Sequence, residues 1–310
     1  MENIKSLITE QQNQRSSQID RKTTTEILET INEEDHLVPI KIKEEIPQIA
    51  LVVNEIVKSI NSGGRLIYVG AGTSGRIGKL DASECPPTYG TPPHLVQGII
   101  AGGDQAVFQA VEGAEDSEEL GALDMDQKDI SEQDIVIGIT ASGRAPYVIG
   151  ALKEARKRGA KTVSFTCNAK AKLHEYGDLH ISIEVGPEVI SGSTRMKAGT
   201  AQKLVLNMLT TAAMIKLGKV YDNLMVDVQP LNKKLIDRAQ HIIAIATGCS
   251  KEEAQRLFKE SGERPKLAIV MHHCQIDVQT AESLLQKESG SVHKAIRAYD
   301  NNMTMYKGGS

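Results

Sequence analysis

The stretch that most constrains the fold is Leu66-Ile67-Tyr68-Val69-Gly70-Ala71-Gly72-Thr73-Ser74-Gly75-Arg76, where a short apolar run leads directly into glycines and hydroxyl residues. A segment compatible with a helix follows it. In a parallel α/β sheet, this order of elements places a phosphate-binding loop at the carboxyl end of a strand. The glycines let the backbone approach an anion closely, and N–H groups at the helix start complement its charge.

The chain from 65 to about 220 supports a doubly wound parallel sheet of the α/β class. Short apolar runs alternate there with segments of helical pattern, which parallel strands need as crossover connections. Ligands of such sheets bind beyond the carboxyl ends of the strands. The predicted strands are Leu66–Val69, Leu95–Ile100, Asp134–Ile139, Thr162–Phe165 and Leu179–Ile183.

Helical patterns precede and follow the predicted sheet along the chain. Thr23 and Glu26 have the spacing of a capping box, and Gly63-Gly64 ends the amino-terminal helices. One long helix is expected over Lys197–Leu217, with Gly218 as its C′ residue. Only helical patterns follow from about 230. The expected segments are therefore a helical extension over 1–62, a sheet domain over 63–220, and a small all-helical domain over 221–310.

Composition excludes several classes of function. The net charge is −4, aromatic residues make up 3% of the chain and Trp is absent, so nucleic acid is not an expected partner. No apolar run approaches membrane-spanning length and no signal pattern begins the chain, so a cytoplasmic location without membrane contact is expected. The four cysteines are far apart, and His272-His273 is the one local histidine pair, so no metal site is predicted.

The opening loop also fits Gly-x-Gly-x-x-Gly, through Gly70, Gly72 and Gly75. A dinucleotide site requires an acidic residue at the end of the second strand, where it binds a ribose hydroxyl. Here that strand is followed by glycines, and Asp104 lies beyond them. The same mixture of hydroxyls, glycine and arginine recurs in Thr140-Ala141-Ser142-Gly143-Arg144 and in Ser191-Gly192-Ser193-Thr194-Arg195. Each loop alone would be a turn or N-cap more often than a site. Three of them favour a phosphate or carboxylate pocket, a pattern typical of a sugar isomerase (SIS) domain.

Longer motifs are Gly70–Arg76, Asp81–Thr88, Ala101–Gly103, Glu112–Asp116, Gly186–Thr200 and Asn223–Asp227. These motifs resemble those of the N-acetylmuramic acid 6-phosphate etherase family. The resemblance covers nearly the whole chain, from about residue 8 to the C-terminal helices. One departure is Ala145, where members of that family often carry Thr after the second loop.

The resemblance implies cleavage of the ether between sugar C3 and a D-lactyl group, giving N-acetylglucosamine 6-phosphate and D-lactate without a metal or organic cofactor. It assigns Glu84 as proton donor and Glu115 as the second acid/base residue. The acidic residues near Glu115 would raise its proton affinity, which suits a base. Lys197 is expected near a substrate anion from its charge and position alone. Phosphate or sugar contacts are expected from Thr73, Ser74, Thr140, Ser142, Ser193 and Thr194.

Two other functions remain open. The same sequence pattern also resembles that of the glucokinase regulatory protein, a non-catalytic sugar-phosphate sensor. A pure sensor would not need Glu84 and Glu115. Aldose–ketose isomerases also use this domain, commonly in two copies or with a second catalytic domain, and only one copy fits between 65 and 220. By analogy with such domains we expect a homodimer with the site near its interface. The C-terminal helices resemble a small ubiquitin-associated-like bundle.

Overall fold

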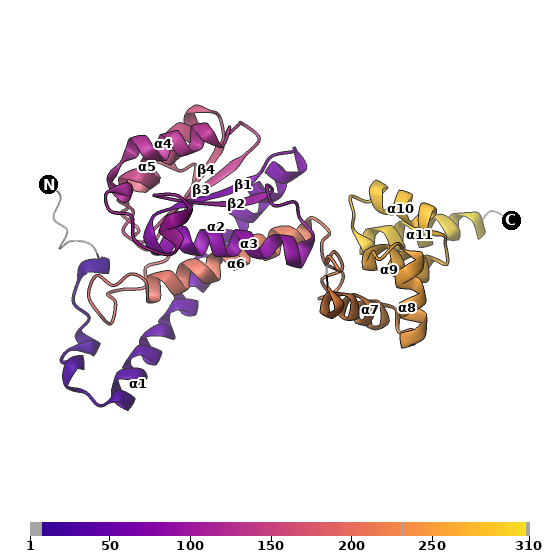
Figure 1. The fold of residues 1–310 in the computed structure, drawn as a ribbon, viewed down its shortest axis with the longest axis horizontal. Coiled ribbons are helices and arrows are strands. Elements are labelled where there is room, and N and C mark those ends of the chain that lie inside the picture. The colour runs from indigo at the N-terminus through magenta and orange to yellow at the C-terminus, as the bar shows by residue number, and fades with distance from the viewer. Residues whose placement is uncertain (1–7, 231, 308–310) are drawn as a thin grey trace. The chain divides into compact units, whose positions relative to one another are not determined.

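The structure of the protein, a computed structural model, describes residues 8–230 and 232–307. The chain forms two compact units (Figure 1). One contains the residues up to Ser83 together with Pro93–Thr210, and the other contains Glu84–Pro92 and the residues from Thr211 onward. The predicted amino-terminal extension therefore belongs to the same compact unit as the sheet, and Glu84 belongs to the other unit.

The sheet in the first unit has five strands, all parallel, in the order β2-β1-β3-β4-β5. This order confirms the predicted doubly wound fold, and each predicted strand is present with its ends displaced by a residue or so. The chain crosses to opposite sides of β1 to form β2 and β3, which makes the carboxyl ends of β1 and β3 the topological switch point. The strands are β1 (Leu66–Gly70), β2 (Val96–Ile100), β3 (Ile135–Thr140), β4 (Lys161–Thr166) and β5 (Leu179–Ser182).

Helices cover both faces of this sheet. Helices α4 (Glu118–Gln127) and α5 (Pro146–Lys157) lie on one face, and α2 (Leu37–Asn61) lies on the other (Figure 1). Gly138 on β3 lets α5 approach closely, because a Cβ there would lie 2.8 Å from Val148 Cγ1. Gly98 on β2 does the same for α3 (Gly72–Tyr89), since its Cβ would lie 2.6 Å from the Lys79 backbone.

The amino-terminal part of the same unit begins with short 3₁₀ turns and continues into α1 (Thr24–Asp35). The predicted capping box is confirmed: Thr23 accepts from the Glu26 N–H, and the Glu26 carboxylate accepts from the Thr23 N–H. Helix α6 (Lys197–Lys216) matches the predicted long helix, and Gly218 has a φ of +73° as a C′ residue requires. Among residues 8–230 and 232–307, the 3₁₀ turns are Ile8–Glu10, Gln14–Ser16, Ile19–Arg21, Asp104–Val107, Ala114–Asp116 and Lys172–Tyr176.

The second unit is helical, as the sequence predicts. Its core joins apolar residues of every helix from α7 to α11, including Ile243, Phe258, Ile269 and Ala295. In the described part of the chain, no helix combines the length and apolarity needed to cross a membrane. The helices are α7 (Lys233–Thr247), α8 (Lys251–Glu260), α9 (Pro265–Cys274), α10 (Val278–Lys287) and α11 (Val292–Lys307).

Candidate active site

The first two hydroxyl loops leave the sheet side by side. Gly70 ends β1 and is paired with Ile139 near the end of β3, so the loops Gly70–Arg76 and Thr140–Arg144 begin at the same edge. That edge is the switch point, where parallel sheets leave a crevice between diverging connections. The fold therefore places both loops where a ligand of such a sheet binds.

The third loop, Ser191–Arg195, reaches the first one through α6. Gly199 lies in the first turn of α6, where a Cβ would be 3.5 Å from Thr73 Cγ2 and 3.6 Å from the Thr194 carbonyl oxygen. The Thr194 carbonyl also accepts a hydrogen bond from the Gly199 N–H at 3.0 Å. Thr73 and Thr194 therefore both adjoin this glycine, and the loops that carry them converge on the start of α6.

The second loop is also close to the start of α6. Ala141 accepts a hydrogen bond from the Cys167 N–H at 3.0 Å, and the Cys167 thiol lies 4.0 Å from the Ala198 carbonyl oxygen. Ala141 and Ala198 are thus separated by one buried residue. All three hydroxyl loops that the sequence predicts to bind an anion are brought together around the amino-terminal end of α6.

The hydroxyls of these loops differ in how they are bonded. Thr140 Oγ1 and Ser142 Oγ lie 3.4 Å apart, and Ser142 Oγ accepts from the Arg144 N–H at 3.3 Å. The four other hydroxyls that the sequence predicts to contact the substrate have no hydrogen-bond partner among residues 8–230 and 232–307, and are available to donate to a bound anion. They belong to Thr73, Ser74, Ser193 and Thr194.

The first loop supplies backbone donors as well. Helix α3 begins at Gly72, whose φ of +51° turns the chain from the end of β1 into the helix. Thr73 and Ser74 lie in its first turn, where N–H groups have no intrahelical acceptor. A helix start of this kind favours a negatively charged group, which agrees with the predicted phosphate site.

Glu115 lies on the 3₁₀ turn Ala114–Asp116, directly before α4. Its side chain is solvent-accessible and makes no hydrogen bond or ion pair with any described residue. Surrounding protein atoms nevertheless desolvate the carboxyl, and this burial, with the negative charge of Asp116, raises the pKa of Glu115. The raised pKa that the sequence led us to expect is therefore present, but burial contributes more to it than the neighbouring acid.

The turn that carries Glu115 is anchored by Ala114 and by contacts of the segment that precedes it. Ala114 is buried in the core cluster shared with α5. Upstream, Arg76 Nε donates to the Val107 carbonyl at 3.0 Å, and Lys79 pairs with Asp104. The segment between β2 and α4 is thereby tied to the first turns of α3, the helix that begins in the first hydroxyl loop.

Glu84 lies inside α3, in the part of that helix that belongs to the second compact unit. The helix continues beyond Glu84 to Tyr89, through Pro86 and Pro87. Each proline lacks the N–H that would donate to the carbonyl four residues before it, so two carbonyls of α3 have no intrahelical donor. Glu84 is exposed and makes no hydrogen bond or ion pair with any other residue in the described part of the chain.

Lys197 has surroundings that the sequence did not reveal. Its side chain is 1% exposed, and Nζ donates to Glu34 Oε2 at 2.5 Å. The backbone N–H of Lys197 donates to the carboxylate of Glu188. The charge expected to meet a substrate anion is therefore compensated inside the protein by a residue of α1.

Glu34 and Glu188 are the two site-adjacent residues that sequence reasoning missed. Glu188 is fully buried and lies five residues before Ser193, inside the Gly186–Thr200 motif, so that motif already contained a signal for it. Glu34 lies in an acidic stretch at the end of α1, and the sequence of this stretch predicts side chains exposed to solvent. Nothing local distinguishes it from its exposed neighbour Glu33.

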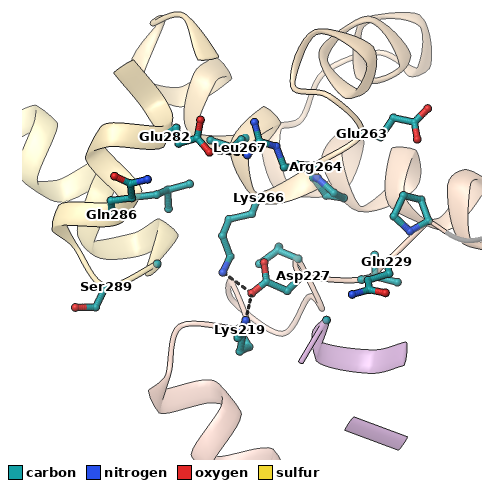
Figure 2. A pocket seen from close by; sticks show the side chains of 17 residues that line it. Lys219, Asp227, Gln229, Glu263, Arg264, Lys266, Leu267, Glu282, Gln286 and Ser289 are labelled. Atoms are coloured by element: carbon teal, nitrogen blue, oxygen red, sulfur yellow. Dashed lines mark hydrogen bonds and ion pairs between the residues drawn. The ribbon is translucent and has the colours of Figure 1, made fainter. Parts of the chain in front are cut away.

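A separate cavity of about 530 Å³ lies in the second unit. Figure 2 shows the charged residues Lys219, Asp227 and Lys266 that line it. Lys266 Nζ and Lys219 Nζ lie 2.5 Å and 3.1 Å from Asp227 Oδ2. Burial lowers the pKa of Lys266, and the charge of Asp227 opposes this effect. Among the described residues, none of the predicted site residues lines this cavity. Asp227, the last residue of the motif Asn223–Asp227, therefore forms an ion pair with Lys266 at the start of α9.

The chain is similar to known protein families and to solved structures. The chain matches the family model of the SIS domain over residues 112–212, and that of the glucokinase regulatory protein N-terminal SIS domain over residues 48–156. A solved structure of a phosphoheptose isomerase from Francisella tularensis aligns with a TM-score of 0.48 and 20% identity, covering 61% of this chain and 98% of that one.

Similarity to curated proteins extends over nearly the full chain. The chain is 51% identical over 294 residues to N-acetylmuramic acid 6-phosphate etherase 2 of Lactiplantibacillus plantarum, and the alignment covers 95% of this chain and 99% of that protein. It is 51% identical over 299 residues to N-acetylmuramic acid 6-phosphate etherase of Clostridium beijerinckii, covering 96% and 98%. It is 50% identical over 304 residues to N-acetylmuramic acid 6-phosphate etherase 1 of Bacillus licheniformis, covering 97% and 100%. The chain therefore belongs to the N-acetylmuramic acid 6-phosphate etherase family.

Proposed function

We propose that this protein cleaves the D-lactyl ether of N-acetylmuramic acid 6-phosphate to N-acetylglucosamine 6-phosphate and D-lactate, as a carbon–oxygen lyase of cell-wall amino sugar recycling. One observation carries the proposal. The chain is about half identical, over nearly its full length, to curated proteins bearing this name. The convergence of three hydroxyl loops on the start of α6 supports the sugar phosphate as substrate.

The chemistry explains why such a reaction needs placed acids and bases. Simple hydrolysis at an unactivated ether carbon is very slow. Opening the sugar ring exposes an aldehyde at C1, which acidifies the hydrogen on C2. A base removes that proton, the lactyl oxygen leaves from C3 as it takes up a proton, and a C2–C3 double bond remains. Water then adds at C3, and a proton returns to C2, so that the sugar product is restored.

We assign the two proton-transfer roles to Glu115 and Glu84. The raised pKa of Glu115 makes it a stronger base toward the C2 hydrogen than an ordinary carboxylate, and no hydrogen bond to a described residue occupies it. Glu84 is the proposed proton donor to the departing lactyl oxygen. Its carboxyl group is likewise free of hydrogen bonds and ion pairs to described residues.

The hydroxyl loops bind the phosphate in this proposal. The hydroxyls of Thr73, Ser74, Ser193 and Thr194 donate to phosphate oxygens together with the first N–H groups of α3. Thr140 and Ser142 are placed at the adjoining edge of β3 and contact the phosphate or the sugar. Neutral donors of this kind allow a phosphate to be held without a strongly basic pocket.

We further propose that the protein acts as a homodimer in the cytoplasm. The helices α1 and α2 leave large apolar side chains exposed, including Leu28 at 61% and Ile40 at 57%. Leu51, at 48%, lies eleven residues after Ile40, which places both on one face of α2. Association of two copies through such side chains would remove them from water.

A second candidate is a non-catalytic sugar-phosphate sensor. The match to the glucokinase regulatory protein N-terminal SIS domain favours it, since a sensor and an enzyme could share the phosphate loops. The two glutamates distinguish the candidates, because a sensor needs neither Glu84 nor Glu115.

The test is to incubate the purified protein with N-acetylmuramic acid 6-phosphate and measure D-lactate. The etherase proposal predicts D-lactate and N-acetylglucosamine 6-phosphate in equal amounts. Glu84→Gln should lower turnover by about two to four orders of magnitude while the folded protein still binds the substrate. Binding without any lactate from the unaltered protein would support the sensor. An isomerised sugar phosphate without lactate would support an isomerase.

A further inference from the structure

The third hydroxyl loop is held by the amino-terminal segment of the chain. Ser16 Oγ donates to the Val189 carbonyl at 2.7 Å, and Asn13 Nδ2 donates to the Pro187 carbonyl at 3.1 Å. The Gly192 N–H donates to the Thr9 carbonyl at 3.3 Å. Residues 9–16, which we name the strap, are therefore bonded at three places to the segment that leads into Ser193 and Thr194.

One ion pair connects this strap to the start of α6. Glu34 Oε2 accepts from Lys197 Nζ at 2.5 Å and from Asn13 Nδ2 at 2.7 Å. Arg15 Nη1 lies 3.3 Å from the other oxygen, Oε1, which is buried and accepts no hydrogen bond from the described residues. Glu34 thus joins α1, the strap and the residue that follows the third loop.

The burial of the pair decides what Lys197 does. The side chains of Glu34 and Lys197 are 3% and 1% exposed. If Lys197 turned toward a substrate anion, Glu34 would lose its closest cation. A buried carboxylate without its cation is unfavourable, so the lysine is kept in place. Burial opposes the charge of Glu34, but the hydrogen bonds from Lys197 and Asn13 still lower its pKa.

From these contacts we propose that Glu34 and Lys197 form a positioning pair, which sets the place of the Ser193 and Thr194 hydroxyls without touching the substrate. The inference rests on the proposed function of that loop as a phosphate site. It replaces the expectation of a direct contact between Lys197 and a substrate anion with an indirect one. The strap then acts as the support that the loop needs because it connects β5 to α6 with little regular structure of its own.

The test compares Glu34→Gln, Lys197→Met and the double variant in the full-length protein. Each single change leaves one buried charge or polar group poorly paired, so KM for N-acetylmuramic acid 6-phosphate should rise about tenfold with kcat changed by less than about threefold. The double variant removes both charges and should recover most of the lost affinity, because no buried ion is left alone. Glu29→Gln, at an exposed position on the same helix and without a hydrogen bond or ion pair to a described residue, is the matched control and should leave KM unchanged.

A direct contact between Lys197 and substrate predicts a different pattern. Lys197→Met and the double variant would then be equally impaired, and Glu34→Gln would leave KM unchanged or lower it. That result would overturn the proposal, as would equal losses in kcat and KM in both single variants. If a single variant does not fold, Ser16→Ala supplies a milder test: it removes the bond to the Val189 carbonyl, and KM should rise about threefold.

The proposed function can fail separately from this inference. If the unaltered protein releases no D-lactate, the etherase proposal is wrong, and the pair is then tested by binding alone. Calorimetry with inorganic phosphate should show weaker binding for each single variant and recovery in the double variant. Equal phosphate affinity in all four proteins would contradict the positioning role.

Discussion

The carboxylate of Glu188 accepts hydrogen bonds from the backbone N–H groups of Lys197 and Ala198, each at 2.9 Å. The amino-terminal end of α6 is therefore capped by a buried carboxylate from the protein itself. A substrate phosphate does not need to complete this helix end. The start of α3 has no such carboxylate bonded to it among the described residues, so the two helix starts have different roles at the site.

The buried position of Glu188 predicts a pH-dependent contribution to stability. Burial raises the pKa of Glu188 above 4.5, although the hydrogen bonds from Ala198 and Lys197 oppose it. The folded protein then holds this proton more tightly than the unfolded chain, so the contribution is favourable at low pH and is lost as pH rises through the folded pKa. Glu188→Gln cannot ionise. The loss of unfolding free energy caused by Glu188→Gln, measured against the unaltered protein, should therefore become smaller as pH rises from about 5 to about 8.

Denaturant unfolding of both proteins across that range measures this difference. Glutamine keeps one carbonyl oxygen but loses the second acceptor, which should cost about 1 kcal/mol at every pH. A difference in unfolding free energy that does not change with pH would show that Glu188 does not titrate in this interval.

Glu115 predicts the acid side of the activity profile. As a base it must be ionised in the free enzyme, and burial followed by the charge of Asp116 raises its pKa. We expect kcat/KM to fall as the pH is lowered, with a midpoint above 4.5. Asp116→Asn removes the neighbouring charge and should move this midpoint to lower pH. Glu115→Gln should lose most of the activity, and retention of the full acid limb by that variant would refute the assignment.

The hydroxyl loops predict losses in substrate binding rather than in turnover. Thr73→Val and Thr194→Val each remove one donor to phosphate, which should raise KM about five- to tenfold with little change in kcat. Thr200→Val is the matched control, since Thr200 is exposed on α6 and has no assigned contact. Steady-state kinetics with N-acetylmuramic acid 6-phosphate measures both effects. A loss in kcat at constant KM would mean that these hydroxyls act on the reacting atoms and not on the phosphate.

The close contact between α4 and α5 predicts a stability effect of unusual sign. A Cβ at Gly150 would lie 2.0 Å from the Glu118 carbonyl oxygen, so the two helices would have to separate. Gly150→Ala should therefore destabilise the protein by about 2 kcal/mol, although alanine normally favours a helix over glycine by about 1 kcal/mol. Lys157→Ala, exposed on the same helix, should change stability by less than about 0.5 kcal/mol. Thermal unfolding of both variants tests this, and a stabilised Gly150→Ala would contradict the contact.

Local signals account for most of the fold that could be predicted. The capping box of Thr23 and Glu26 depends on residues three positions apart, so it is readable from the sequence. The strands were recognisable because buried parallel strands form continuous apolar runs, and the β1 loop because glycines and hydroxyls follow such a run directly. The parallel sheet and the helical second unit were both predictable for these reasons.

The rest depended on contacts between distant residues. Glu34 and Lys197 are 163 positions apart, so no local pattern marks their pairing or the burial of the lysine. The course of α3 through Pro86 and Pro87 is also not readable from the sequence, because proline usually ends or breaks a helix. For Glu115, the sequence indicated crowding by like charge, whereas the larger effect is burial.

The central claim is that the lactyl ether is broken by elimination at C3, and that water then adds a hydroxyl group at C3. The most direct measurement is to run the reaction in ¹⁸O-labelled water and locate the label by mass spectrometry of product fragments. Aldehyde hydration can label C1, so the position within the sugar must be resolved. We predict label at C3 of N-acetylglucosamine 6-phosphate and unlabelled hydroxyl oxygen in D-lactate. Label in that lactate hydroxyl, with none at C3, would show cleavage on the lactyl side and would contradict the mechanism.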